Sequence, residues 1–139
     1  MNLTTQDIAK LGEIATLLEV SGYPKPGNVH RTQDFSDMKY EDFLISSASI
    51  RDPLYIAAYN GHKSYPYMLN DIGIGECIFD CVRGTNTLTH TNTNLGISML
   101  LIPIAATFGA LVDENPINKL QKTLDTIIKN TEVDDAVAL

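Results

Sequence analysis

The sequence predicts an all-α protein, a multi-helix bundle around a central apolar helix at about residues 95–112. Three observations favour this class. Apolar residues recur at steps of three and four along most of the chain, as they do on one face of a helix. No segment alternates apolar and polar residues in the manner of a half-buried strand. Asparagine, glycine and proline residues separate the helical segments.

The first helix is predicted to begin at Thr4, because Asp7 follows three residues later in the pattern of a capping box. It is predicted to end near Ser21-Gly22, before the first proline of the chain. Its apolar residues recur at helical spacing and are expected to form the buried face; they are Ile8, Leu11, Ile14, Ala15 and Leu18.

Two further helical pieces are predicted in the next third of the chain. One begins near Tyr40 and is broken or kinked near Pro53, since proline removes a helical hydrogen bond. The other covers Leu54–Tyr59 and ends at Asn60-Gly61. Residues 61–71 are polar and aromatic, and they are expected to form a loop or a short helix.

Both cysteines lie on the apolar stripe of a helix that is predicted to begin near Ile74. We expect Cys77 and Cys81 to be buried structural thiols rather than metal ligands or a redox pair, because free cysteine packs as a small hydrophobe. The segment Arg83–Asn94 is predicted to be a polar loop. Asn94 is a suitable N-cap for the apolar helix that follows.

The segment Leu95–Val112 carries no charge and is about long enough to cross a bilayer. It contains Pro103 and lacks flanking basic clusters or an aromatic belt, so we expect a buried core helix and no membrane span. Asn115-Pro116 is predicted to start another helix, whose buried face comprises Ile117, Leu120, Leu124, Ile127 and Ile128. Thr131–Leu139 is expected to open one more.

Composition is typical of one folded domain, residues 1–139, because 44% of the residues are hydrophobic. The net charge of −7 argues against nucleic-acid binding, which requires a basic surface. The two cysteines make no disulfide framework, and the N-terminus lacks the apolar stretch of a signal peptide. We therefore expect a cytoplasmic protein.

A basic loop, Tyr23–Arg31, is the first feature that exceeds the needs of a helical bundle. Its two prolines stiffen the stem that presents Lys25, and Gly27 permits a sharp turn. Lys25, His30 and Arg31 form a basic cluster in an acidic protein, a composition that suits a polyphosphate, with Gly27 and Asn28 between them. The alternative is a helix stop followed by a solvated loop.

Acidic residues follow this loop closely. Carboxylates of this kind can hold Mg²⁺ together with substrate phosphates. Asp37 and Glu41 are expected to share a helix face, with Asp34 just outside it, and Asp42 completes the set. The alternative is an ordinary acidic helix start that complements the helix dipole.

The third feature lies at the start of the apolar helix, where free N–H groups favour anions. Asn92, Thr93 and Asn94 carry amides and a hydroxyl that can bind a ribose or a base, and Gly96 permits close approach. The alternative is a capped helix after a polar loop. Glu19, beside the basic loop, is expected to pair with Lys25 or Arg31, or to act on substrate.

Five runs of residues, in order along essentially the whole chain, resemble the triphosphoribosyl-dephospho-CoA synthase family and in particular its archaeal branch. They are Leu18–Ser21 (LEVS), Pro24–Arg31 (PKPGNVHR), Asp37-Met38, Phe43-Leu44 and Asn92–Gly96 (NTNLG). The resemblance implies an all-helical transferase that joins ATP to 3′-dephospho-CoA and releases adenine. Lys25 and Arg31 would then hold the triphosphate with Mg²⁺, and Glu19, Asp34 and Asp37 are the candidate acids or bases.

The chain departs from the bacterial pattern at two places. His30 stands where those members have an aspartate, and Asn94-Leu95 replaces a His-Lys pair. The acceptor is accordingly expected to be a CoA-like or another nucleotide, and the alternative function is a non-catalytic nucleotide-binding or scaffold fragment of the same fold. Family members are longer, so we expect an N-terminal part that is completed by self-association or by a complementary C-terminal chain.

Overall fold

Six α-helices and one short 3₁₀ helix make up the part of the chain that the computed structural model describes, residues 3–114 and 117–131. No strand occurs in these two ranges, so the predicted all-α class is confirmed. The elements are α1 (Thr5–Val20), α2 (Tyr40–Ser49), α3 (Arg51–Ser64), η1 (Leu69–Ile72), α4 (Ile74–Thr89), α5 (Leu95–Ala110) and α6 (Leu120–Lys129).

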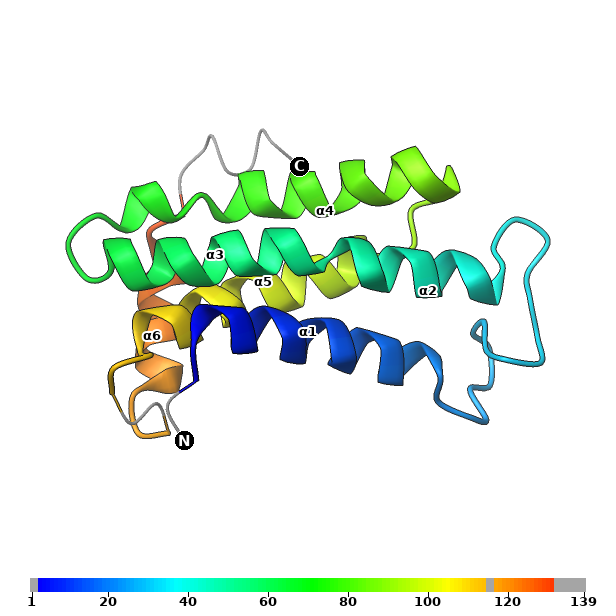
Figure 1. Cartoon of the computed structure of the whole chain (residues 1–139), viewed down its shortest axis with the longest axis horizontal. Helices are drawn as coiled ribbons and strands as arrows, with labels where there is room; N and C mark the ends of the chain where they lie inside the picture. The colour runs from blue at the N-terminus through cyan, green and yellow to red at the C-terminus, as the bar shows by residue number, and fades with distance from the viewer. Residues whose placement is uncertain (1–2, 115–116, 132–139) are drawn as a thin grey trace.

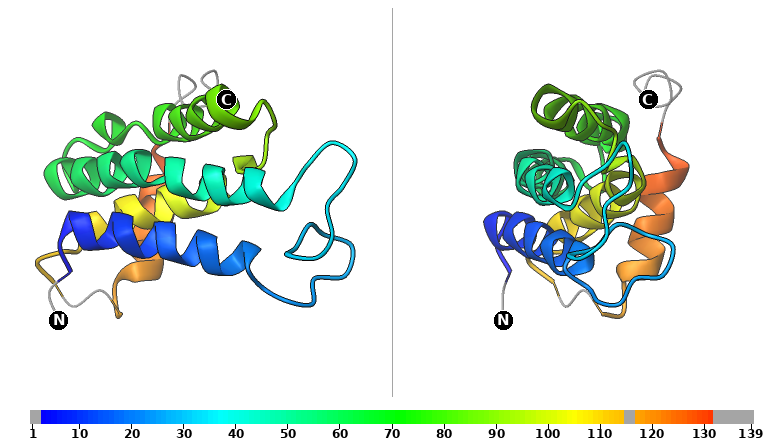
Figure 2. Two further views of the ribbon diagram at one scale, coloured as in Figure 1. Left: turned by 45° about the vertical axis from the view of Figure 1, so that its right-hand side comes forward. Right: turned by 90° about the vertical axis from the view of Figure 1, so that its right-hand side faces the viewer.

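The apolar helix α5 lies at the centre of the bundle, as predicted. It packs against α1, α3, α4 and α6, whereas α2 and α3 follow one another end to end along one side (Figure 1). The view along the bundle shows α1, α3 and α4 on one side of α5 and α6 on the other (Figure 2). No described helix is long and apolar enough to span a bilayer.

Two glycines allow α3 and α5 to approach closely. A Cβ atom on Gly61 would lie 2.0 Å from the Ala106 carbonyl oxygen, and one on Gly109 would lie 1.9 Å from that of Ala58. The prediction that Gly61 ends the helix is therefore wrong. It is an interior residue of α3 that is retained for the contact with α5, which outweighs its poor helix propensity.

Helix α1 begins with the predicted capping box. The Thr4 hydroxyl accepts a hydrogen bond from the Asp7 N–H at 3.2 Å, and the Asp7 carboxylate accepts from the Thr4 N–H at 3.0 Å. These bonds hold the pKa of the exposed Asp7 carboxyl below its usual value. The helix ends at Val20, as predicted.

The buried face of α1 is not the predicted one. Of the five residues expected there only Ile8 is buried, while Leu11, Ile14, Ala15 and Leu18 are exposed. Smaller residues form the packed face: Ala9, Thr16 and Val20 are buried, and Gly12 lies directly on Leu54 of α3. The face with smaller residues packs on α3 because it allows the two helices to approach closely. Apolar periodicity alone does not distinguish this face from the one with larger apolar residues.

The boundary between α2 and α3 falls at Ile50, before the predicted break at Pro53. Pro53 lies in the first turn of α3, where the backbone N–H has no helical partner and proline costs nothing. Tyr40 begins α2 as predicted.

Helix α4 extends to Thr89, so most of the predicted polar loop Arg83–Asn94 is helical and the connection shrinks to residues 90–94. Hydroxyl side chains are accommodated in the helix because they bond backbone carbonyls one turn earlier; for example, Thr89 donates to the Thr85 carbonyl at 3.2 Å. His90 then closes α4 with a left-handed backbone, φ 58°.

The two cysteines are buried on the inner side of α4, as predicted. Cys81 is fully enclosed, and burial, with smaller effects of Cys77 and Asp80, raises the pKa of its thiol to about 12. The thiol is therefore neutral at physiological pH and serves as a packing group.

Helix α6 begins at Leu120, later than predicted, and Asn115-Pro116 lies outside the described residues. Only part of its expected apolar face is covered, since Ile127 is buried whereas Ile117 is 81% and Ile128 49% exposed. The helix predicted within Thr131–Leu139 falls almost entirely outside the described residues.

Candidate functional site

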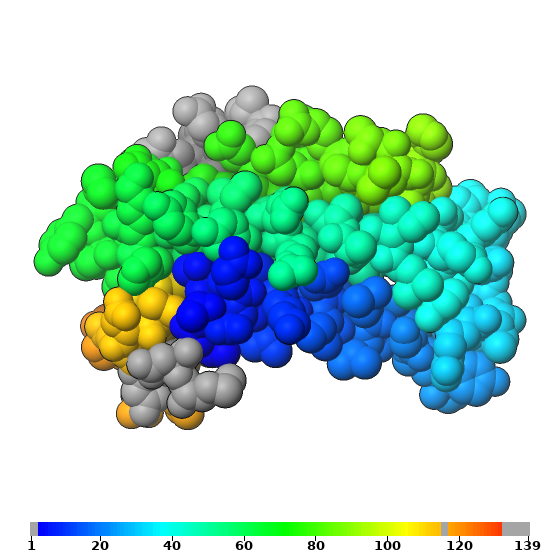
Figure 3. Space-filling view, in the orientation of Figure 1, coloured from blue at the N-terminus to red at the C-terminus, as the bar shows by residue number. Residues whose placement is uncertain are grey.

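The basic loop, Tyr23–Arg31, forms the first part of the connection between α1 and α2. The Ser21 hydroxyl and the Tyr40 phenol lie 3.2 Å apart, within hydrogen-bonding distance, and so hold the two ends of this connection together. Residues between these ends project past both helices as a separate lobe of the surface (Figure 3). The loop is therefore accessible to a ligand while its ends are held by the bundle.

A tight turn presents Lys25. The Asn28 N–H donates to the Lys25 carbonyl at 3.1 Å, with Pro26 second and Gly27 third in the turn. Gly27 has a φ of 77°, the left-handed conformation that favours glycine. Val29, which is 1% exposed, anchors the far side of the turn in the protein.

Glu19 and Lys25 form an ion pair, which is one of the three alternatives that the sequence left open for Glu19. The Lys25 ammonium donates to Glu19 Oε1 at 2.6 Å. The Lys25 side chain is 17% exposed and that of Glu19 is 49% exposed, so the carboxylate lies on the solvent side of the pair. An acid and a base are thus held side by side at the end of α1.

Arg31 packs against an aromatic side chain that sequence reasoning did not select. Its guanidinium carbon lies 5.7 Å from the centre of the Tyr23 ring, and the His30 ring meets that of Tyr23 edge-on at 5.3 Å and 80°. His30 itself is buried, and its Nδ1 lies 3.3 Å from the Thr32 hydroxyl. The sequence signal that could have identified Tyr23 is an aromatic residue in the same loop as Arg31.

The acidic residues do not gather into one cluster. Asp34 accepts a hydrogen bond from the Tyr40 N–H at 2.8 Å, and Asp42 accepts one from Lys39 N–H at 2.9 Å, so both carboxylates stabilise the start of α2. Asp37 precedes α2, so the prediction that it shares a helix face with Glu41 is wrong. Residues 3–114 and 117–131 contain no group of three side chains placed to hold a metal ion.

The loop before α5 lies at the same end of the bundle as the basic loop (Figure 1). Asn92 Oδ1 accepts a hydrogen bond from the Leu95 N–H at 3.3 Å and so caps α5. Asn94, the predicted cap, occupies the N-cap position, but its side chain makes no capping bond. The predicted N-cap position is thus confirmed, but the capping hydrogen bond comes from Asn92 and not from Asn94.

The Asn94 side chain turns into the protein instead, and only 1% of the residue is exposed. Its amide donates to the Thr85 hydroxyl at 2.5 Å and to the Cys81 carbonyl at 3.3 Å. Among the described residues, neither Asn94 Oδ1 nor the buried Thr93 hydroxyl has a hydrogen-bond partner. Asn94 therefore joins α5 to α4 from within.

A model of the family described as ATP:dephospho-CoA triphosphoribosyl transferase matches residues 5–139. The chain belongs to this family. The match bears out the resemblance and supports triphosphoribosyl-dephospho-CoA synthase activity for the chain, as the sequence predicted. No curated protein and no solved structure gives a significant match.

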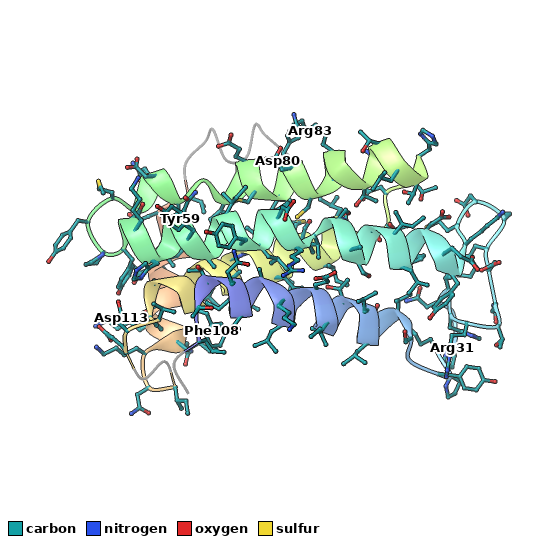
Figure 4. The ribbon with its side chains drawn as sticks, viewed as in Figure 1. Arg31, Tyr59, Asp80, Arg83, Phe108 and Asp113 are labelled. Atoms are coloured by element: carbon teal, nitrogen blue, oxygen red, sulfur yellow. The ribbon has the colours of Figure 1, made fainter. Side chains whose placement is uncertain are left out.

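In this member of the family, charged and apolar surfaces lie apart. The basic loop carries Lys25, which pairs with Glu19, and Arg31, which stacks on Tyr23, at one end of the bundle. An open groove of about 200 Å³ runs instead between α1, α3 and α5, and its lining residues carry no charge. Phe108, which lines it, lies near the start of α1 at the opposite end from Arg31 (Figure 4). The groove is thus no phosphate site.

Proposed function

We propose that this chain transfers the triphosphoribosyl group of ATP to a dephospho-CoA-like acceptor at the end of the bundle that carries the basic loop. The observation that carries this proposal is the Glu19–Lys25 ion pair at the end of α1, since it holds a carboxylate against a cation of the accessible loop that also carries Arg31. The family match over residues 5–139 supports the same reaction.

Lys25 and Arg31 are the residues we assign to the triphosphate. Lysine acts on phosphate as a point charge, whereas arginine can donate two parallel hydrogen bonds. The turn at Gly27 and Asn28 lets the backbone approach the ligand closely. The buried His30 supports the loop through its contact with the Tyr23 ring. Triphosphate binding would draw Lys25 from Glu19 and leave that carboxylate available.

Glu19 is the first candidate for proton transfer, with Asp34 and Asp37 as alternatives. The bond between C1′ of the ATP ribose and N9 of adenine breaks, and its electron pair leaves with adenine, which takes up a proton. The acceptor 2′-hydroxyl oxygen forms the new bond to C1′ and gives its proton to a carboxylate. A carboxylate near C1′ also stabilises the positive charge that develops there.

Mg²⁺ is proposed to arrive with ATP rather than to occupy a site formed by the protein alone. It usually keeps several waters and is held by one or two carboxylates together with substrate phosphates. Asp37, before α2, and Glu41, in its first turn, are both exposed and are the carboxylates we assign to it. Asp34 is a weaker candidate because it caps α2.

Asn92 and Thr93 are proposed to contact the ribose or the base, with Asn94 holding their loop in place from inside. The acceptor is a CoA-like or another nucleotide. We place the protein in the cytoplasm, where two buried free thiols are usual.

Self-association is also proposed. The groove between α1, α3 and α5 is flanked by exposed apolar residues of the same helices: Leu11 is 49%, Leu18 67% and Leu100 61% exposed. Soluble monomers rarely expose a larger continuous apolar patch than a few hundred Å². A second copy related by a two-fold axis would cover the same face on both subunits, and a complementary C-terminal chain is the alternative occupant.

The reaction is tested by incubating the protein with ATP, Mg²⁺ and 3′-dephospho-CoA and measuring free adenine by chromatography. We expect acceptor-dependent adenine release, and we expect Lys25→Ala to reduce kcat/KM for ATP about 10- to 100-fold, since it removes a charge-assisted contact to the triphosphate. Glu19→Gln should reduce turnover with little effect on ATP binding.

Lys129→Ala is the matched control, because Lys129 also forms a 2.7 Å ion pair with a carboxylate, that of Asp125, but on α6. It should leave adenine release unchanged. Binding of ATP without any acceptor-dependent release of adenine would favour the non-catalytic alternative.

A further inference from the structure

Tyr23 is an exposed aromatic residue whose position the bundle does not require. It is 60% exposed, yet its ring contacts two side chains of the same loop. His30, only 7% exposed, meets the ring edge-on, and the Arg31 guanidinium lies 5.7 Å from its centre. The buried histidine thus orients the ring, and the ring in turn supports the arginine.

Stacking and phosphate binding use different parts of a guanidinium. A ring attracts the planar face of the cation, whereas the five N–H donors point outward in the plane. In the part of the chain that the structure describes, Arg31 forms no ion pair, unlike Lys25 with Glu19. Its donors are therefore not occupied by a carboxylate.

Figure 4 shows Arg31 in the loop beyond the end of α1. A long side chain at such a site loses rotamer freedom when it binds a ligand, and a side chain already held against a ring loses less. The Tyr23 ring therefore orients Arg31 before the ligand arrives.

We propose that Tyr23 is a positioning residue, which holds Arg31 in the orientation that binds the polyphosphate of the nucleotide substrate. The inference rests on the proposed function, because that function assigns Arg31 to the triphosphate. It adds that the planar guanidinium of Arg31, fixed by the Tyr23 ring, binds the phosphates through paired hydrogen bonds, whereas Lys25 binds them as a point charge.

The test measures binding of inorganic tripolyphosphate to the full chain by calorimetry at constant salt. Tyr23→Leu should weaken binding about 2- to 5-fold, the range expected from an exposed cation–π contact. Tyr23→Phe keeps the ring and should bind as the wild type does. Circular dichroism checks that each variant is folded.

A matched control exists on α4, where the Arg83 guanidinium lies 5.6 Å from the centre of the Phe79 ring. Arg83 lies on the outer side of that helix (Figure 4), so Phe79→Leu should not change tripolyphosphate binding. In an Arg31→Ala background, Tyr23→Leu should have no further effect, because the residue acts through the arginine. An equal loss in both backgrounds, or no loss in either, overturns the proposal.

The adenine assay separates this inference from the proposed function. If ATP is cleaved, Tyr23→Leu should raise KM for ATP more than it lowers kcat. Tripolyphosphate binding that depends on Tyr23 without adenine release would contradict the transferase and leave the positioning role intact. Adenine release that is insensitive to Tyr23→Leu in both KM and kcat would contradict the positioning role alone.

Discussion

Asn94 shows how a side chain chosen for ligand contact can serve the fold instead. Its amide connects the first residue before α5 to Thr85 and Cys81 of α4, and Thr85 in turn lies 3.0 Å from the Ser49 hydroxyl at the end of α2. One buried polar network thus joins three helices beneath the loop that carries Asn92 and Thr93. Buried networks of this kind favour a single arrangement of the elements they connect.

We expect Asn94→Ala to lower the free energy of unfolding by about 1–3 kcal/mol, because it leaves the buried Cys81 carbonyl and Thr85 hydroxyl short of a donor. Urea denaturation followed by circular dichroism measures the change. Asn86→Ala, an exposed substitution on α4, is the control and should be neutral within about 0.5 kcal/mol. Equal stability of the two variants would contradict the structural role of Asn94.

At the scale of the element, the contact between α3 and α5 decides the geometry of the bundle. Gly61 and Gly109 each lie against a carbonyl of the facing helix, so the two backbones touch without side chains between them. Glycine in a helix interior costs up to about 1 kcal/mol relative to alanine. The closer packing of the central helix offsets this cost.

Gly61→Ala should therefore destabilise the protein by about 1–3 kcal/mol, since the new methyl group would lie 2.0 Å from the Ala106 carbonyl oxygen and force the helices apart. Thermal unfolding measures the effect. Gly96→Ala lies in α5, where no atom is within 4 Å of the added carbon, so it should stabilise the protein slightly. A Gly61→Ala variant as stable as the wild type would show that α3 and α5 are not in close contact.

At the scale of the whole molecule, polar chemistry and apolar contact occupy separate surfaces. The basic loop lies where α1 ends and α2 begins, whereas the uncharged groove is formed by α1, α3 and α5. The larger apolar residues of α1 face solvent beside this groove, because its small residues pack on α3. The proposed second copy would therefore cover the groove and leave the basic loop open.

We expect light scattering to give twice the mass of one chain, and Leu11→Glu to yield monomers, since a charge would then lie in the apolar groove. Leu88→Glu is the control, because Leu88 is also exposed, at 60%, but lies on α4. It should remain a dimer. A wild-type protein that is monomeric at high micromolar concentration would rule out self-association over this face.

Patterns in the sequence predicted the helical class, the central helix and the capping box of α1, and they included the ion pair of Glu19 with Lys25 among three alternatives for Glu19. These features depend on residues close together in the chain, where spacing determines which side chains meet. The family match supports the reaction that the resemblance of five runs, PKPGNVHR among them, had implied.

Contacts between distant residues decided the rest. Gly61 continues α3 because Ala106 of α5 lies against it, and α4 extends through a polar segment because Asn94 and Ser49 hydrogen-bond Thr85. The apolar spacing on α1 predicted an amphipathic helix but not which of its faces packs on the bundle. The face with the smaller side chains is the buried one, because it allows closer packing of the helices. Local spacing allows several helix ends and buried faces, and contacts between distant residues determine which of them form. The ends of α3 and α4 and the buried face of α1 are therefore evident only in the folded protein.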